Sequence, residues 1–134
     1  MLYFSSTRTS TSDIYESESH GGAFGPAAAV TELNTAAQDG QPNVRRDGLE
    51  IFFFSSRVGA AGNDIYVATR VSTTDPWSTP INLGLNVNSA ASVTRPSLSW
   101  DGATLYFGSN RSGGGAEGDS DHYVTTREPL TGGN

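Results

Sequence analysis

A short acidic stretch near the C-terminal end holds the densest group of potential ligand side chains in this sequence. Glu117, Asp119 and Asp121 alternate along it, and calcium prefers clustered carboxylate oxygens. The spacing of a complete EF-hand loop is missing. The stretch "GGGAEG" at 113–118 runs into a strand-like segment, whereas a dinucleotide-binding loop must open a helix. We therefore interpret these carboxylates as solvated loop residues and predict no metal and no cofactor.

Side chains suited to catalysis are sparse elsewhere. His20 and His122 are the only imidazoles, and there is no cysteine, no G-x-S-x-G context and no histidine-rich metal spacing. Acid–base hydrolysis of a sugar would need two carboxyl groups about 5–10 Å apart. The sequence offers only Asp47 and Asp101, which recur in equivalent turns. We predict no catalytic residue, which favours a non-enzyme without excluding an enzyme.

The segments that must position these side chains form an internal repeat. The phrase "LYFSSTR" at 2–8 returns as "IFFFSSR" at 51–57 and as "LYFGSNR" at 105–111. Each phrase is followed by a polar loop and then by an Asp that opens a tyrosine-bearing segment, at Asp13, Asp64 and Asp121. Pro42 and Pro96 are 54 residues apart. Such agreement between separate landmarks indicates a repeated structural unit.

Each repeat contains four strand candidates. A proline-led piece, at 42–48 and 96–102, closes on Asp-Gly, which is a strong hairpin signal. The repeated phrase and the tyrosine-bearing segment alternate apolar and polar residues, and an apolar piece follows Phe24 or Trp77. No segment has helical periodicity. The sequence thus predicts an all-β fold of ten short strands, in which Phe24 and Trp77 anchor the last strand of each unit against the adjacent repeat.

The repeat resembles a known family. The pattern P-x-[LV]-x-x-D-G-x-x-[LI]-[YF]-F-x-S-x-R followed by D-I-Y-V is similar to the WD40-like repeat of the PD40, or TolB-like, β-propellers. It is carried by Pro42–Arg57 with Asp64–Val67, and by Pro96–Arg111 with Asp121, Tyr123 and Val124, where His122 replaces the Ile. The resemblance implies β-propeller blades of four antiparallel strands, about two and a half in one domain of residues 1–134. The expected boundaries are a partial blade at 1–34, a blade at 41–88 and a partial blade at 95–130.

An open arc of blades predicts a partner, because bare apolar faces and strand edges invite association. Propellers close with about four to eight blades. The chain is either a half-propeller that closes its ring by self-association, most simply as a homodimer, or a fragment of a longer propeller. We favour the self-associating ring.

Positions at which the repeats differ are the candidates for ligand binding, because a binding site occurs once whereas blade-building residues recur. In propellers of the family that this chain resembles, the proline-led strand lines the central axis. The candidates on it are Gln41, Asn43, Arg45, Arg95 and Ser97. The arginines suit an anionic or sugar-like ligand, and a protein ligand is a further possibility.

The recurrent arginines and aspartates are assigned a structural role by the same logic. Each Arg at the end of the repeated phrase and the Asp after its loop bracket one strand connection. They predict a cross-strand ion pair or loop hydrogen bonds. The residues are Arg8, Arg57 and Arg111 with Asp13, Asp64 and Asp121.

Charge and hydropathy exclude two classes of partner. The net charge is −6 and all eight basic residues are scattered arginines, which argues against a nucleic-acid surface. The longest apolar runs, "IFFF" and "AAAV", are far below the roughly 20 residues that span a bilayer, so no membrane partner is expected. The N-terminus lacks the features of a signal peptide. The compartment stays open: periplasmic or extracellular if a leader was removed, and otherwise cytoplasmic.

Three functions remain from the sequence. The favoured one is a non-enzymatic β-propeller module for binding or scaffolding. The alternatives are a carbohydrate-active enzyme, either a glycosidase or a lyase with an axial site, and an assembly unit or propeller fragment without its own activity.

Overall fold

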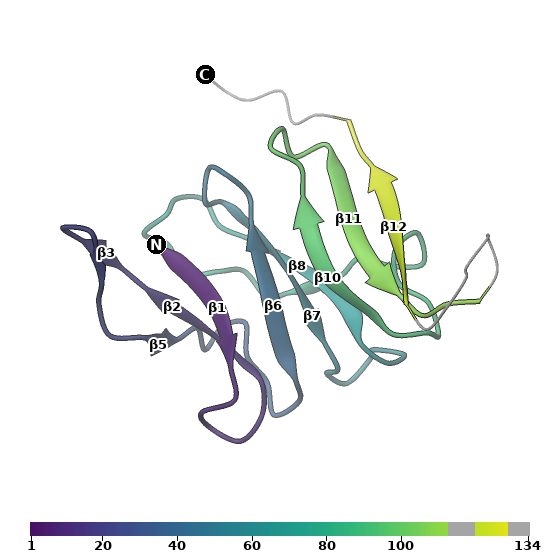
Figure 1. The fold of residues 1–134 in the computed structure, drawn as a ribbon, viewed down its shortest axis with the longest axis horizontal. Coiled ribbons are helices and arrows are strands. Elements are labelled where there is room, and N and C mark those ends of the chain that lie inside the picture. The colour runs from purple at the N-terminus through teal and green to yellow at the C-terminus, as the bar shows by residue number, and fades with distance from the viewer. Residues whose placement is uncertain (113–119, 129–134) are drawn as a thin grey trace.

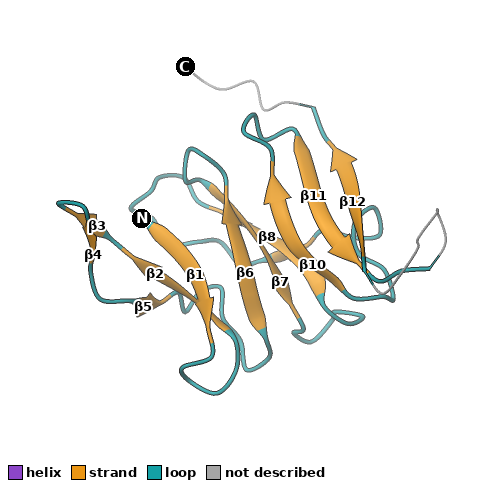
Figure 2. Ribbon diagram, viewed as in Figure 1, coloured by secondary structure: helices purple, strands orange, loops and turns teal. Residues whose placement is uncertain are grey.

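The chain folds entirely into strands and loops. Its computed structural model describes residues 1–112 and 120–128, and these residues form twelve strands and no helix. The all-β class is therefore confirmed (Figure 2). The strands are β1 (Leu2–Ser6), β2 (Asp13–Ser17), β3 (Ser19–His20), β4 (Ala23–Phe24), β5 (Ala28–Ala29), β6 (Asp39–Val44), β7 (Glu50–Ser55), β8 (Asp64–Thr69), β9 (Ile81–Asn82), β10 (Val93–Leu98), β11 (Thr104–Ser109) and β12 (Asp121–Thr126).

Three antiparallel sheets follow one another along the chain (Figure 1). The first sheet has the strand order β1-β2-β5, the middle sheet β6-β7-β8-β9 and the third sheet β10-β11-β12. The proline-led pieces form β6 and β10, and the repeated phrase forms β1, β7 and β11. Since β6 contacts both β1 and β10, these strands bring one edge of each of the three sheets together.

Asp-Gly turns connect the proline-led strands to the next strand, as the sequence predicts. Gly48 and Gly102 have φ of 75° and 72°, a left-handed conformation in which a side chain would be strained. The Gly48 N–H donates to the Arg45 carbonyl at 2.8 Å, and the Gly102 N–H donates to the Ser99 carbonyl at 2.9 Å. Both turns thus close in the same way.

A small hairpin of β3 and β4 is the one sheet that the sequence did not predict. Its turn residues, Gly21 and Gly22, both have positive φ, at 60° and 86°, which is the requirement of a type I′ turn. The hairpin carries Phe24, whose side chain is 60% exposed. The prediction that Phe24 anchors the sheet was wrong, whereas Trp77 is only 5% exposed and does so.

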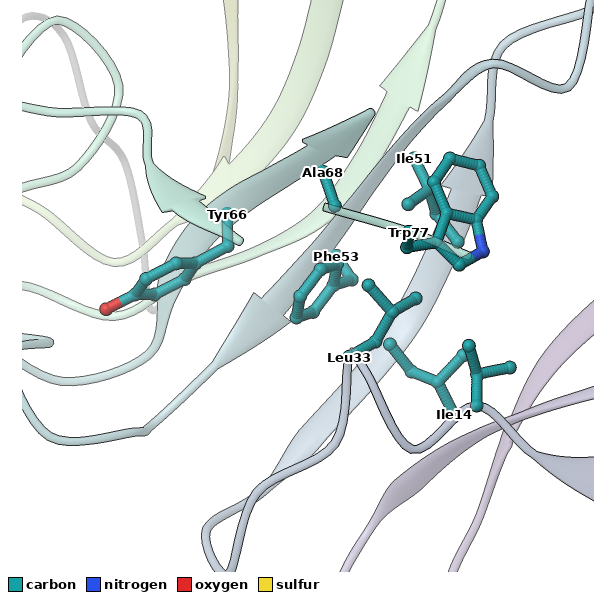
Figure 3. Close-up of a cluster of buried hydrophobic side chains, with 8 residues drawn as sticks. Ile14, Leu33, Ile51, Phe53, Tyr66, Ala68 and Trp77 are labelled. Atoms are coloured by element: carbon teal, nitrogen blue, oxygen red, sulfur yellow. The ribbon is translucent and has the colours of Figure 1, made fainter. Parts of the chain in front are cut away.

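Two apolar clusters hold the three sheets face to face. The cluster between the first and middle sheets, which we call the first junction, contains Ile14 from β2, Ile51 and Phe53 from β7, and Trp77 (Figure 3). The cluster between the middle and third sheets, the second junction, contains Phe52 and Phe54 from β7. Because successive side chains of a strand point to opposite faces, β7 supplies both junctions.

Each recurrent Arg lies over an aromatic pair of its own sheet. The Arg57 guanidinium carbon is 5.2 Å from the Phe53 ring centroid and 4.8 Å from that of Tyr66, and these two rings stack at 6.3 Å. Equivalent stacks join Arg8 to Phe4 and Tyr15, and Arg111 to Phe107 and Tyr123.

Within the described part of the chain, the recurrent arginines make loop hydrogen bonds and form no ion pair with the recurrent aspartates. Arg57 donates through Nε to the Ser55 hydroxyl and through a terminal nitrogen to the Leu33 carbonyl at 2.6 Å. Asp64 instead accepts from the Ala61 N–H and the Asn82 amide. Of the two predicted arrangements, loop hydrogen bonds are therefore the one observed, and Arg57 forms its ion pair with the buried Asp39 of β6 at 2.8 Å instead of with Asp64.

An asparagine in the loop before each proline-led strand completes the edge of the preceding sheet. The Asn88 amide oxygen accepts from the Ile65 N–H at 2.7 Å, and its nitrogen donates to the Ile65 carbonyl at 2.9 Å. Asn34 makes the same two bonds to Ile14. The side chain thus substitutes for a strand residue and fixes the loop to the sheet.

We expect Asn88→Ala to lower the free energy of unfolding by about 2 kcal/mol, because it leaves the buried Ile65 N–H without an acceptor. Urea unfolding followed by circular dichroism measures the change. Asn86→Ala, at an exposed position two residues earlier, serves as the matched control and should change the stability by less than about 0.5 kcal/mol. Equal effects of the two substitutions would contradict the assigned role.

Candidate functional site

The five predicted ligand residues lie on or directly after β6 and β10. Gln41 and Asn43 belong to β6, Arg95 and Ser97 belong to β10, and Arg45 follows β6. Gln41, Arg95 and Ser97 are exposed, while Asn43 and Arg45 are partly buried. The structure brings the residues of the two strands together at one edge of the sheets.

Gln41 and Arg95 have an unusual backbone conformation. Their φ angles are 52° and 55°, in the left-handed region that residues other than glycine seldom adopt. Both precede a proline, which normally favours an extended conformation. Both also lie where the strand register shifts, between Gly40 and Asn43 in β6 and between Thr94 and Ser97 in β10. Matched bulges thus turn the same point of each strand outward.

Side chains of β6 join it to β10. The Gln41 Oε1 atom accepts a hydrogen bond from the Arg95 N–H at 2.8 Å, and the Asn43 Oδ1 atom accepts one from the Leu98 N–H at 2.9 Å. The two strands belong to different sheets, so no backbone ladder connects them. Gln41 and Asn43 therefore have a structural role in joining the middle and third sheets.

Arg45 belongs to a separate group of charges. Its guanidinium bonds to both carboxylate oxygens of Asp47 through Nε at 2.9 and 3.0 Å, and reaches Glu50 at 3.1 Å. Arg127 binds the same Glu50 carboxylate with two hydrogen bonds, at 2.9 and 2.6 Å. Glu50 is buried, so these two arginines compensate its charge at the second junction. The Arg45 guanidinium is thus already bound to two carboxylates of its own chain.

These contacts shift the pKa values of the charged groups. The hydrogen bond from Arg45 is the main factor that lowers the pKa of Asp47 below its usual value, and the bond to Asp47 raises the pKa of Arg45. The bond to Glu50 likewise raises the pKa of Arg127. Glu50 and Arg127 were not among the residues predicted from the sequence, because 77 residues separate them. The recurrence of Arg70 as Arg127 is the one sequence signal that marks Arg127.

Arg95 and Ser97 are the two candidates whose side chains remain available to a ligand. Both are exposed, and among the described residues Arg95 has no ion pair and Ser97 has no side-chain hydrogen bond. Nearby, the Arg46 guanidinium carbon lies 4.1 Å from the ring centroid of the exposed Trp100. The arrangement offers a cation and a hydroxyl beside a strained backbone, which suits binding of an anionic or polar group.

Paired catalytic acids are not found in the described part of the chain. Asp47 is bound to Arg45, and Asp101 accepts hydrogen bonds from the Ser99 hydroxyl and the Ala103 N–H in the equivalent turn. Within residues 1–112 and 120–128 no three potential metal ligands cluster. The acidic-stretch residues Glu117 and Asp119, and the "GGGAEG" segment, lie outside the described residues.

Comparison with known proteins adds no family. No protein-family model and no curated protein matches this sequence. Among the described residues there is also no helix with the length and hydropathy that a membrane crossing requires.

Asp47→Asn should destabilise the protein in a pH-dependent way. A lowered folded-state pKa means that the ionised carboxylate contributes stability above its unfolded pKa, and that this contribution is lost as the pH falls through the folded value. At pH 7 the loss should stay below about 1 kcal/mol because the side chain is half exposed. The difference from wild type should vanish in acid.

Thermal unfolding at pH 7 and near pH 2 measures this effect. Asp75→Asn is the control, since Asp75 is exposed and has no ion pair within the described residues. A pH-independent effect of Asp47→Asn would contradict an electrostatic role for Asp47.

Arg95→Gly should be more stable than Arg95→Ala by about 1 kcal/mol, because only glycine adopts the left-handed conformation without strain. At the neighbouring Thr94, where φ is not positive, the order should reverse and alanine should be the more stable residue. Chemical unfolding of the four variants tests both statements. Equal stability of the two Arg95 variants would show that the bulge stores no strain.

Proposed function

We propose that the chain is a non-enzymatic binding or scaffold module that completes a β-propeller ring by self-association. The observation that carries this proposal is an exposed apolar face on the third sheet. Tyr106 and Val124 lie on that face and are 51% and 58% exposed. Exposed large apolar side chains that share one sheet face are a common feature of association surfaces.

The equivalent residues of the middle sheet are covered by a neighbouring sheet, which supports a partner on the exposed face of the third sheet. Phe52 and Val67, which hold the same repeat positions as Tyr106 and Val124, are neighbours across β7 and β8. Phe52 is buried in the second junction and Val67 packs against it. A partner packed on the exposed face of the third sheet would cover Tyr106 and Val124 as Phe52 and Val67 are covered at the second junction.

The first sheet carries the complementary face. Its residues Leu2 and Phe4 hold the repeat positions of Ile51 and Phe53, which are fully buried at the first junction. Leu2 is 40% exposed and Phe4 is partly buried. The third sheet of one copy therefore fits the first sheet of a second copy, in the order in which sheets pack within the chain.

A two-fold ring of two chains satisfies both faces with one type of contact used twice. Each apolar side chain of this size contributes about 1.5–3 kcal/mol when it becomes fully buried. Four such side chains at each contact would be comparable to the whole stability of a typical domain, about 5–15 kcal/mol. This balance favours the assembled ring over an isolated arc.

The inner edge formed by β6 and β10 is the proposed binding surface. Arg95 and Ser97 are exposed there, next to the bulges at Gln41 and Arg95. The described residues provide a cation for an anionic ligand and no pair of free acids for hydrolysis. The geometry therefore supports binding better than catalysis.

Self-association is tested by the mass of the protein in solution. We expect wild type to have the mass of two chains, and Val124→Glu to dissociate it, because the substitution places a carboxylate in the apolar contact. Val58→Glu is the matched control: Val58 is fully exposed in a loop outside the sheets, so the dimer should persist.

Light scattering coupled to gel filtration, or sedimentation velocity, gives the three masses. A wild-type monomer that unfolds cooperatively, with a stability equal to that of Val124→Glu, would refute the proposal. Larger open assemblies that Val124→Glu disperses would support the same contact without ring closure.

A further inference from the structure

The second junction contains a cavity of about 160 Å³ between the middle and third sheets. Its lining includes apolar side chains and one guanidinium, namely Phe52, Val87, Leu98, Leu105, Thr125 and Arg127. The residues come from the middle sheet, from the loop before β10 and from all three strands of the third sheet. The cavity thus lies within one chain and does not depend on a second copy.

The internal repeat shows what occupies the equivalent space at the first junction. The six lining residues correspond by repeat position to Tyr3, Leu33, Val44, Ile51, Ala68 and Arg70. Five of these six belong to, or pack against, the cluster that holds the Trp77 side chain. Figure 3 shows the Trp77 ring beside Ile51, with Leu33 and Ala68 nearby.

The Trp77 ring is held between an aromatic ring and a cation. Its centroid lies 6.0 Å from that of Tyr3, edge to face, and the Arg70 guanidinium carbon lies 4.1 Å from it. Arg70 is fixed by a hydrogen bond from Nε to the Gly48 carbonyl at 2.7 Å. The first junction is therefore built around a buried indole.

The second junction has the same two walls. Phe52 stands at the position of Tyr3, and Arg127 stands at that of Arg70 with the same Nε bond, to the Gly102 carbonyl at 2.7 Å. The Arg127 guanidinium carbon is 5.8 Å from the Phe52 ring itself. Trp77 follows Arg70 by seven residues, whereas the seventh residue after Arg127 is Asn134, which has no ring.

We propose that this cavity is a binding socket for an indole or a similarly flat aromatic ring. Apolar walls give such a ring a large hydrophobic contribution, and the guanidinium of Arg127 adds a cation–π contact. Glu50 holds Arg127 at the cavity with two hydrogen bonds, so the cation is preorganised. A free aromatic molecule and a tryptophan side chain of a peptide present the same chemistry.

The test titrates the full chain with indole, with N-acetyltryptophanamide and with a short tryptophan-containing peptide. Amide chemical shifts report binding, and those of Ala103 and Arg127 should move most. We expect saturation with a Kd of about 0.1–1 mM for indole, in line with the efficiency of small ligands. Tighter binding of indole identifies a free small molecule as the ligand class, and tighter binding of the peptide identifies a protein partner.

Variants assign the binding to the cavity. Thr125→Phe places a ring in the cavity from β12 and should weaken indole binding more than tenfold. Val71→Phe adds the same ring at an exposed position, next to Arg70, and should leave the Kd within twofold of wild type. If Thr125→Phe does not fold, Ala103→Leu fills the cavity from another side and should give the same loss.

The proposal is overturned if none of the three probes saturates, or if the filled variants bind indole as wild type does. The titration is repeated with Val124→Glu, which carries its change on the opposite face of the third sheet. Binding should persist in that variant whether or not it dissociates, so failure of the socket and failure of self-association are distinguishable.

Discussion

The burial of both faces of β7 is the constraint on which the rest of the structure depends. Every residue from Glu50 to Ser55 is buried, although the strand contains only six residues. A strand in this position must be apolar on both sides, which explains why "IFFF" shows a continuous apolar run instead of alternation. The middle sheet therefore requires a neighbouring sheet on each face, whereas the first and third sheets each have only one face covered within the chain.

Two of the recurrent arginines connect their own sheet to the sheet that precedes it in the chain. Arg57 donates to the Leu33 carbonyl and Arg111 to the Val87 carbonyl, so each reaches the loop that follows the preceding sheet. Arg8 lies over Phe4 and Tyr15 in the same manner, but its described side-chain hydrogen bond is to Ser6. The stack on the aromatic pair thus needs only the residues of one sheet. The bond to the loop forms only where another sheet precedes it in the chain.

Local patterns predicted the strands, and long-range packing decided most of what they missed. Repetition identified β1, β2, β6, β7, β8, β10, β11 and β12, and Asp-Gly identified the turns, because these depend on neighbouring residues. Phe24 was expected to be buried by analogy with Trp77. A buried position needs a facing sheet, and Phe24 lies instead in a hairpin that two glycines make possible. Repetition alone cannot reveal which copies have a neighbour.

The sequence placed the candidate residues on the proline-led strands, but it did not predict their contacts. Gln41, Asn43, Arg95 and Ser97 lie on facing strands, as their repeat positions indicated. The bonds of Gln41 and Asn43 to the backbone of β10 depend on bulges that distort the register, and no sequence pattern marked those bulges. The bond of Arg45 to Asp47 is local, whereas its link to Glu50 and the distant Arg127 could not be assigned from the sequence.

A charge that does not recur, that of Glu50, favours one order in which the recurring sheets pack. Glu50 lies on the face of the middle sheet that meets the third sheet, where Arg127 binds it. In the N-terminal repeat the position of Arg127 is held by Ser19, which is uncharged and lies in the separate hairpin of β3 and β4. If a first sheet packed on this face, the Glu50 carboxylate would lose one of its two guanidinium partners while staying buried. Removing one ion-pair partner from a buried carboxylate is destabilising, because the remaining Arg45 compensates its charge less completely. Apolar repetition makes all faces similar, and the buried Glu50 with its bound Arg127 makes one pairing better than the others.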